Sequence, residues 1–341
     1  MSLLFMDGFD DGLSLLGKWS FTNNVSITTG GRQGNRALMQ DNSDSVMRRT
    51  VNTPDEHATF IVGFAFMLGS SYAASSICNF YSDALATSHI SMGVDNNNAI
   101  VIRRGDGTVL GTSSNNTLTP GVFQYVEIKV TLGDAGAGGV EVRVNGATVL
   151  NLVAIDTKNG GTKTVLETVS FNASSGPTGT VYYLDDIYIC NGASTINNDF
   201  LGDCTVYTLL PVANGTYSNW GGSDGNTIDN YLLVDDNPVS TADYVASDTP
   251  EAADSYEFTP IPMTGNIKGV VHRSYASKSD AGDRSFRQIM LDAGDTIYGG
   301  PDIPLGTAWA IYSRMMEESP ESGAAWMPGA LNSDEFGVQV R

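Results

Sequence analysis

The sequence predicts an all-β protein with two β-sandwich or jelly-roll domains. Its 38 glycines indicate many turns, and Val, Ile, Thr, Tyr and Phe recur in short blocks between Gly, Asn, Asp and Ser. Long segments of helix-forming residues at helical spacing are absent. Hydrophobic residues make up 41% of the chain and charged residues 16%, which excludes a disordered protein. A chain of 341 residues exceeds a single hydrophobic core, so we expect two domains, residues 1–192 and 193–341.

Two central strands are expected in the first domain. Residues 58–68 carry large apolar side chains on one face and small or apolar ones on the other, as in a strand covered on both faces. Residues 122–132 alternate more regularly, with apolar side chains on one face only. The opposite face carries Tyr125, Glu127 and Lys129, and we expect it to contact solvent.

A hairpin and a closing strand complete the first domain. In residues 140–144, valines alternate with polar side chains. Asn145-Gly146 then favours the positive φ angles of a type I′ turn, so residues 147–152 are expected to return as the second arm. Residues 181–190 are expected to form the last strand, and the small polar residues that follow place the domain boundary at 192.

The second domain shows short apolar blocks separated by turn-rich stretches. A repeat of strand and turn at intervals of about ten residues is typical of a sandwich or jelly roll. We also expect a short helical turn from Pro328 to Asn332. The predicted strands are residues 205–210, 231–234, 255–258, 267–275, 285–291 and 307–316.

Charge and cysteine content exclude several kinds of partner. The chain has 38 acidic and 18 basic residues, a formal net charge of −20, with no basic cluster larger than a pair. Electrostatic binding to nucleic acid is therefore not expected. No apolar stretch is long enough for membrane insertion, and we expect no secretion signal because the first residues have neither a basic start nor a long apolar run. The three cysteines, Cys78, Cys190 and Cys204, cannot all pair and are expected to be buried thiols made in a reducing cytoplasm.

Several segments of residues 1–192 carry a family resemblance by their order and spacing. They are Asp7-Gly8-Phe9-Asp10-Asp11, Trp19, Gly34-Asn35-Arg36-Ala37-Leu38, Tyr125-Val126-Glu127-Ile128, Val142-Arg143-Val144-Asn145-Gly146 and Leu184-Asp185-Asp186-Ile187-Tyr188. Together they resemble concanavalin A-like (laminin G-like) jelly rolls. The resemblance implies two packed antiparallel sheets that carry a concave face.

The second half carries a different resemblance. It begins Phe200-Leu201-Gly202-Asp203-Cys204, passes through Pro211, Trp220 and Tyr231, and is similar to a segment that follows such domains in many bacteriophage virion proteins. The resemblance implies a structural component of a bacteriophage particle, such as a tail, fibre or capsid-surface decoration protein. Other virion proteins and further copies of the chain are the implied partners. The implied location is the virion, assembled in the host cytoplasm.

No catalytic residue is predicted, and we expect the chain not to be an enzyme. Glycoside hydrolases of the concanavalin A-like fold need carboxylates spaced Glu-x-Asp-x-(x)-Glu on one strand. The nearest set, Glu251, Asp254 and Glu257, has the wrong spacing. The three histidines accompany no nucleophile motif and are expected to be ordinary surface or turn residues: His57, His89 and His272.

Five aspartates near the two ends of the first domain are candidates for a calcium site or for structural carboxylates: Asp7, Asp10, Asp11, Asp185 and Asp186. Acidic turns without metal are the commoner case. We therefore expect Asp185 and Asp186 to accept hydrogen bonds from the N-terminal turn, and we predict no metal or other cofactor.

Two functions of different classes are compatible with these features. The first is the virion component, which acts by protein docking and by adhesion to the host surface. The alternative is a carbohydrate-binding, lectin-like module with its sugar site on the concave face of the first domain. Tyr217 and Trp220, in a glycine-rich stretch of the second domain, are candidates for stacking on sugar rings. An enzyme that degrades bacterial polysaccharide is supported only by analogy of fold.

Overall fold

The computed structural model describes residues 1–33, 36–40, 44–69, 74–82, 85–134, 136–174 and 181–341, with only the backbone at 74, 75, 173 and 174. Gly34 and Asn35 of the resemblance lie outside the described residues. The chain divides into two compact units. The first comprises Met1–Asp10 and Lys18–Val206, and the second comprises Asp11–Gly17 and Tyr207–Arg341. The division therefore follows Val206 instead of residue 192, and a short N-terminal segment belongs to the second unit.

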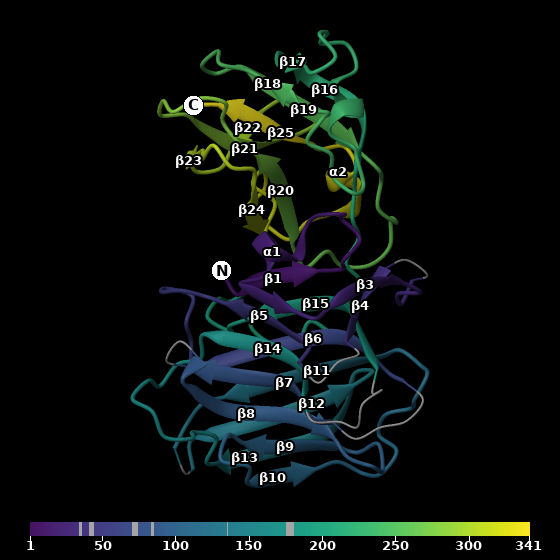
Figure 1. Cartoon of the computed structure of the whole chain (residues 1–341), viewed down its shortest axis with the longest axis vertical. Helices are drawn as coiled ribbons and strands as arrows, with labels where there is room; N and C mark the ends of the chain where they lie inside the picture. Colours follow the sequence, from purple (N-terminus) through teal and green to yellow (C-terminus); the bar gives the residue numbers. More distant parts are fainter. Residues whose placement is uncertain (34–35, 41–43, 70–73, 83–84, 135, 175–180) are drawn as a thin grey trace. The chain divides into compact units, whose positions relative to one another are not determined.

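The first unit is a sandwich of two antiparallel sheets with the apolar core between them (Figure 1). Rings from both sheets meet there: the centroids of Phe64 and Phe171 lie 5.2 Å apart, edge to face. The predicted sandwich is confirmed. In spatial order the first sheet contains β13 (Ala147–Ile155), β12 (Gly138–Val144), β11 (Gln124–Thr131), β6 (Thr59–Leu68), β15 (Tyr182–Cys190), β4 (Arg36–Gln40) and β3 (Ser26–Thr29), and β1 (Leu3–Asp7) pairs with β15.

The second sheet faces the first across this core. Its strands, in spatial order, are β10 (Val109–Thr112), β9 (Ile100–Arg104), β8 (Thr87–Val94), β7 (Ala74–Ser82), β14 (Thr168–Ser174), β5 (Val46–Thr50) and β2 (Phe21–Asn23).

The strands expected from the sequence of the first domain are present. β6 lies between β11 and β15 in the sheet and is almost wholly buried, as its apolar pattern predicts. β12 and β13 form the hairpin, with φ angles of 49° at Asn145 and 79° at Gly146, as the type I′ turn requires.

The polar face of β11 differs from the prediction. Tyr125 and Glu127 are each only 1% exposed, although we expected them to face solvent. Residues from much later in the chain cover this part of the strand. The alternation of residues within β11 cannot predict that cover, because it reflects only the two faces of the strand.

The second unit is a smaller all-β structure in which two sheets share a core. One is a two-stranded sheet formed by residues 270–276 and 310–316, and it lies against the other, larger sheet. Gln288 of the larger sheet joins them, because its side-chain amide donates to the carbonyl oxygens of His272 (3.0 Å) and Tyr312 (3.2 Å). In spatial order the larger sheet contains β16 (Pro211–Ser218), β19 (Ala253–Phe258), β25 (Glu335–Val340), β21 (Ser285–Leu291) and β22 (Ile297–Gly299), with β23 (Ile303–Pro304) beside β21. The two-stranded sheet that lies against it pairs β20 (Val270–Ala276) with β24 (Ala310–Met316). A further short pair is formed by β17 (Gly221–Gly222) and β18 (Val245–Ala246).

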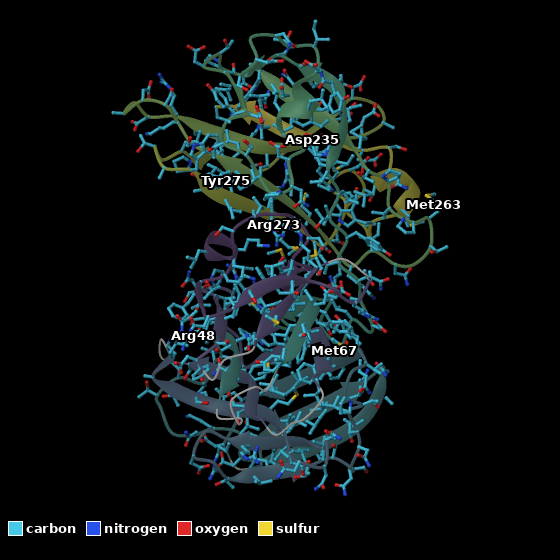
Figure 2. The ribbon with its side chains drawn as sticks, turned by 45° about the vertical axis from the view of Figure 1, so that its right-hand side comes forward. Arg48, Met67, Asp235, Met263, Arg273 and Tyr275 are labelled. Atoms are coloured by element: carbon cyan, nitrogen blue, oxygen red, sulfur yellow. The ribbon has the colours of Figure 1, made fainter. Side chains whose placement is uncertain are left out.

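Residues 11–17 belong to this second unit through specific contacts. Arg273 of the strand at Val270–Ala276, which is labelled in Figure 2, donates to the carboxylate of Asp11 at 2.6 Å. A side chain at Gly17 would meet Ile311 of β24. These contacts explain why residues 11–17 belong to the second unit, although the residues on either side of them belong to the first.

Several predicted elements of the second domain are confirmed and two are wrong. Residues 205–210 form no strand, and 231–234 fall largely in a 3-10 helix, η2 (Asn230–Leu233). The helical turn near Pro328 is present as α2 (Pro328–Leu331), and a kinked turn, α1 (Leu15–Lys18), occurs near the N-terminus. Among the described residues, no helix is long and apolar enough to span a bilayer.

Candidate functional site

The outer face of the first sheet, which points away from the sandwich core, carries a group of polar side chains. Neighbouring strands place Glu127 of β11, Gly63 of β6 and Tyr188 of β15 side by side. Because a Cβ at Gly63 would clash with the ring of Tyr188, this ring can lie across the strand only if residue 63 is glycine. The Tyr188 hydroxyl then donates a hydrogen bond to Glu127 Oε1 at 2.6 Å.

Residues 199–206, which we call the covering segment, lie over this pair. The backbone N of Leu201 donates to the Tyr188 hydroxyl oxygen at 3.1 Å, and that of Gly202 donates to Glu127 Oε1 at 2.8 Å. Tyr188 is 2% exposed and Glu127 is 1% exposed. A buried carboxylate and hydroxyl could exchange a proton, but a substrate cannot reach them while the segment is in place.

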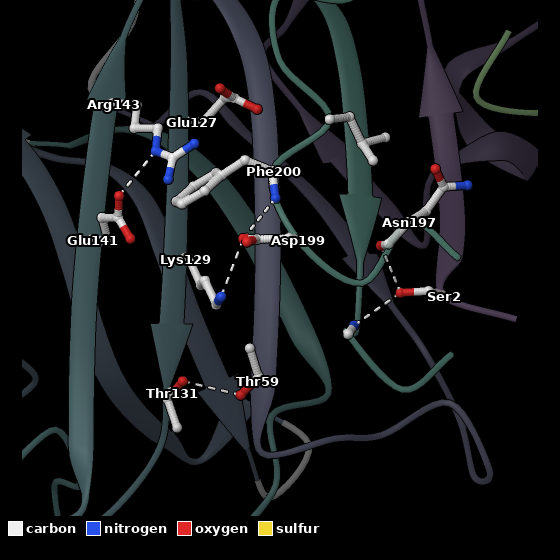
Figure 3. A network of polar contacts seen from close by, with 12 residues as sticks. Ser2, Thr59, Glu127, Lys129, Thr131, Glu141, Arg143, Asn197, Asp199 and Phe200 are labelled. Carbon is white, nitrogen blue, oxygen red and sulfur yellow. Dashed lines mark hydrogen bonds and ion pairs between the residues drawn. The ribbon is translucent and has the colours of Figure 1, made fainter. Parts of the chain in front are cut away.

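Beside the buried pair, a second group of side chains stays half-exposed (Figure 3). The guanidinium carbon of Arg143 lies 4.0 Å from the ring centroid of Phe200, and Lys129 Nζ lies 5.8 Å from it. Lys129 donates to the Asp199 carboxylate at 3.1 Å, and Arg143 donates to Glu141 at 2.9 Å. Two cations and an aromatic ring therefore meet on a chain whose net charge is −20.

A third cation, Arg32, holds the other end of the covering segment. Its guanidinium donates to the carbonyl oxygen of Cys204 at 2.9 Å and pairs with the carboxylates of Asp203 and, at 3.3 Å, Asp186. The same guanidinium lies 5.2 Å from the ring centroid of Tyr125, in cation–π geometry.

Burial dominates the proton affinity of the groups beneath the covering segment. Burial, followed by the charge of Asp186, raises the pKa of Asp185 to about 7. Burial also raises the pKa of Asp186. The pKa of Tyr188 is raised by burial and then by the Glu127 carboxylate, so its hydroxyl keeps its proton at neutral pH and acts as a donor.

The aspartates proposed as calcium or structural carboxylates accept hydrogen bonds from different donors. Asp7 is fully buried and accepts from Lys18 Nζ at 2.9 Å and Trp19 Nε1 at 2.8 Å. Asp10 accepts from the backbone N of Arg36 at 2.9 Å. Among the described residues, no group of three or more His, Cys, Asp or Glu side chains could hold a metal ion.

Asp185 and Asp186 both accept hydrogen bonds, but their donors differ from the prediction. Asp185 accepts from the backbone N of Arg32 at 2.9 Å, and Asp186 accepts from the backbone N of Val206 at 2.7 Å. We expected donors from the N-terminal turn. β1 does pair with β15, but the bulge at Asp185 and Asp186, where Asp186 has a φ of 50°, turns both carboxylates toward Arg32 and the covering segment.

The two aromatic candidates of the second unit are half-buried. Tyr217 packs on the apolar cluster that contains Ile289 and Leu291. Trp220 donates from Nε1 to the carbonyl oxygen of Ala252 at 3.0 Å, and its backbone N donates to Asp254 at 2.7 Å. Both side chains therefore stabilise the edge of the larger sheet.

His89 corrects the expectation that the histidines are surface or turn residues. It lies on β8 and is fully buried. Its Nε2 is 2.8 Å from the Ser82 hydroxyl, and its Nδ1 accepts from the backbone N of Asn159 at 3.0 Å. The imidazole thus joins a strand to a loop as a structural residue.

The residues of the outer face are far apart in the sequence, and we did not expect them to form one site. The alternation of β11 and β12 placed Lys129 and Arg143 on solvent-facing sides, which was a usable signal because cations are scarce in this chain. Arg32, Tyr188 and Phe200 join them only through the folding of distant segments.

No protein-family model matches the sequence, and a comparison with curated proteins gives no match. Solved structures to which parts of this chain are similar include an endo-β-1,4-glucuronan lyase from Trichoderma reesei, at 13% identity over 56% of this chain and 96% of that chain, with a TM-score of 0.41. An alginate lyase variant in complex with alginate tetrasaccharide matches at 11% identity over 55% and 92%, with a TM-score of 0.39. Trypanosoma rangeli sialidase in complex with sialic acid matches at 10% identity over 50% and 27%, with a TM-score of 0.37.

These structures correct one expectation from the sequence. We expected a chain that is not an enzyme, because it contains no recognisable catalytic motif. The proteins named above are enzymes that process carbohydrates, so the lack of a familiar motif does not exclude an enzyme.

Proposed function

We propose that the chain binds a carbohydrate that bears carboxylate groups, through Lys129, Arg143 and Phe200 on the outer face of the first sheet. One observation supports this proposal: on a strongly acidic chain, two half-exposed cationic side chains lie over the same half-exposed aromatic ring. A guanidinium and an ammonium are the groups that bind carboxylates, and an aromatic face stacks on a sugar ring.

The contact that a ligand must replace is weak. The side chain of Asp199 is 61% exposed, and ion pairs of this kind contribute about 0–1 kcal/mol. A sugar carboxylate can therefore take the place of the Asp199 carboxylate on Lys129. Leu201 to Val206 can remain anchored through their bonds to Tyr188, Glu127 and Asp186. The net charge of −20 repels a polyanion at long range, but salt screens this repulsion beyond about 8 Å.

A glycan array tests the proposal with the intact chain and two double variants. Lys129→Met with Arg143→Met removes both cations and keeps the apolar stems. Lys278→Met with Arg284→Met makes the same change in net charge in the second unit, at one half-buried and one exposed residue. We expect uronate- or sialate-containing glycans to bind the intact chain and the second variant, and to lose binding in the first. Equal binding by both variants would refute the assignment of the site, and release of new reducing or unsaturated ends would show that a bound glycan is also cleaved.

We further propose, from the resemblances of residues 1–192 and of the segment that begins at Phe200, that the chain is a component of a bacteriophage particle. Carbohydrate binding would then serve adhesion to a host-surface glycan. Other virion proteins and further copies of the chain are the partners in this proposal. Mass spectrometry of purified particles tests it, and absence of the chain from particles that are complete in their other proteins would reject it.

A further inference from the structure

A cavity of about 250 Å³ lies in the second unit where β19, α2 and the start of β25 come together. It is smaller than the pockets of about 300–1,000 Å³ that hold drug-sized ligands, so it suits a side chain or a very small molecule. Apolar and acidic groups line it, including Leu209, Glu257, Phe258, Leu331, Asp334 and Phe336.

The acidic wall contains a buried carboxylate oxygen without a donor. Asp334 is only 6% exposed, and within the described part of the chain its Oδ2 has no hydrogen-bond partner. The adjacent polar groups are already engaged: Asn332 bonds the backbone of Ile261, and Glu335 accepts from Thr216 and Ser255. An unpaired buried carboxylate is costly, so a positive group at this position would be favourable.

The other walls select the kind of positive group. Phe258 and Phe336 meet edge to face, with their centroids 5.9 Å apart, and Leu209 and Leu331 add aliphatic surface. A hard metal ion takes about six to eight oxygen ligands, which these apolar walls cannot supply. An alkyl chain with a cationic tip matches both the apolar walls and the carboxylate.

We propose that this cavity binds an organic cation, an alkylammonium or guanidinium group, with the Asp334 carboxylate as its counter-ion. The cation can be a free small amine or the tip of a Lys or Arg side chain from another protein. This proposal is independent of the carbohydrate site on the first unit.

Ligand-observed NMR on the full-length chain provides the test, at about pH 7.5, which lies above the pKa of about 6 that burial gives to Asp334. The probes are n-butylammonium and its uncharged counterpart n-butanol. We expect saturation transfer to the ammonium but not to the alcohol, and affinity for the ammonium about ten- to hundredfold weaker in Asp334→Asn. The control Asp248→Asn, at an exposed residue away from the cavity, makes the same change in net charge and should bind like the parent chain. Undiminished binding by Asp334→Asn, or equal binding of n-butanol, would overturn the proposal.

Two further measurements complete the test. Competition by Nα-acetyl-lysine amide or Nα-acetyl-arginine amide assigns the cation to a protein side chain, while butylammonium binding without such competition assigns it to a free amine. Both results support the counter-ion role of Asp334. Should Asp334→Asn not fold, the parent chain itself remains informative, because its affinity for butylammonium should fall as the pH drops below about 6.

The pH dependence follows from the surroundings of Asp334. Burial, followed by the charges of Glu321 and Asp292, raises its pKa to about 6, and Glu257 and Glu335 are further acidic groups of the cavity wall. Protonation of Asp334 removes the counter-ion. An affinity that stays constant from about pH 7.5 to about pH 5 would therefore contradict the assignment.

Discussion

Gly63 is the residue on which the buried pair of the outer face depends. Its missing side chain lets the Tyr188 ring cross β6 and reach Glu127. Gly63→Ala should lower the free energy of unfolding by about 1–3 kcal/mol, the usual cost of overpacking. Gly139→Ala is the control, because a Cβ there meets only the Leu152 carbonyl oxygen, at 3.2 Å. Denaturant titration measures both variants, and an equal or smaller loss in Gly63→Ala would contradict the assigned role.

Asp185 should make the stability of the first unit depend on pH. Its pKa in the folded chain, about 7, lies above the ordinary value of 3.8 because of burial and the charge of Asp186. The folded state therefore keeps a proton that the unfolded state releases, so the cost of ionising Asp185 is absent below about pH 4 and fully present above about pH 7.

Asp185→Asn removes this dependence. We expect the variant to gain stability over the parent chain at about pH 8 and to lose that advantage at about pH 4. The comparison variant is Asp134→Asn, whose side chain is 83% exposed. The measurement is the unfolding free energy of each chain at the two pH values. If the difference between Asp185→Asn and the parent chain is the same at both, Asp185 does not titrate in this range.

At the scale of elements, the sequence was most informative where local patterns decide the structure. The period-two alternation of β6, β11 and β12 and the Asn145-Gly146 turn predicted these strands and their hairpin correctly. β16 was not predicted because its sequence, Pro-Val-Ala-Asn-Gly-Thr-Tyr-Ser, is rich in turn-forming residues. Pairing with β19 overrides that local preference.

The candidate site shows where sequence patterns stop being informative. Alternation assigned Glu127 and Lys129 to one face of β11 but could not show that residues 199–206 cover Glu127 and pair with Lys129. The strand predicted at 205–210 does not form, and the backbone N of Val206 donates to the Asp186 side chain. Long-range contacts of this kind have no local sequence signal.

Asp199, at the start of the covering segment, should limit the access of a ligand to Lys129. Asp199→Asn removes the charge that pairs with Lys129 and keeps an oxygen able to accept from the backbone N of Phe200. We expect affinity for an acidic oligosaccharide to rise by up to about fivefold, in line with the strength of exposed ion pairs. Asp203→Asn is the matched control at the Arg32 end. Weaker binding by Asp199→Asn would mean that Asp199 helps to hold the ligand.

For the whole molecule, the two units divide the proposed roles. The outer face that carries the carbohydrate site belongs to the first unit, and the cavity beside Asp334 belongs to the second. The virion proposal adds self-association, because particle components occupy symmetric positions. Light scattering coupled to size exclusion on the purified chain should give the mass of a closed oligomer, and a monodisperse monomer at all concentrations would contradict self-association.

Isothermal titration of the intact chain with an oligoglucuronate tests the central claim most directly. We expect saturable binding that weakens by at least about tenfold in the variant with Lys129→Met and Arg143→Met, because charge-assisted hydrogen bonds contribute about 1.5–3 kcal/mol each. The variant with Lys278→Met and Arg284→Met should bind like the parent chain. Absence of binding to any acidic oligosaccharide, or binding that ignores the loss of Lys129 and Arg143, would contradict a carbohydrate site on the outer face of the first sheet.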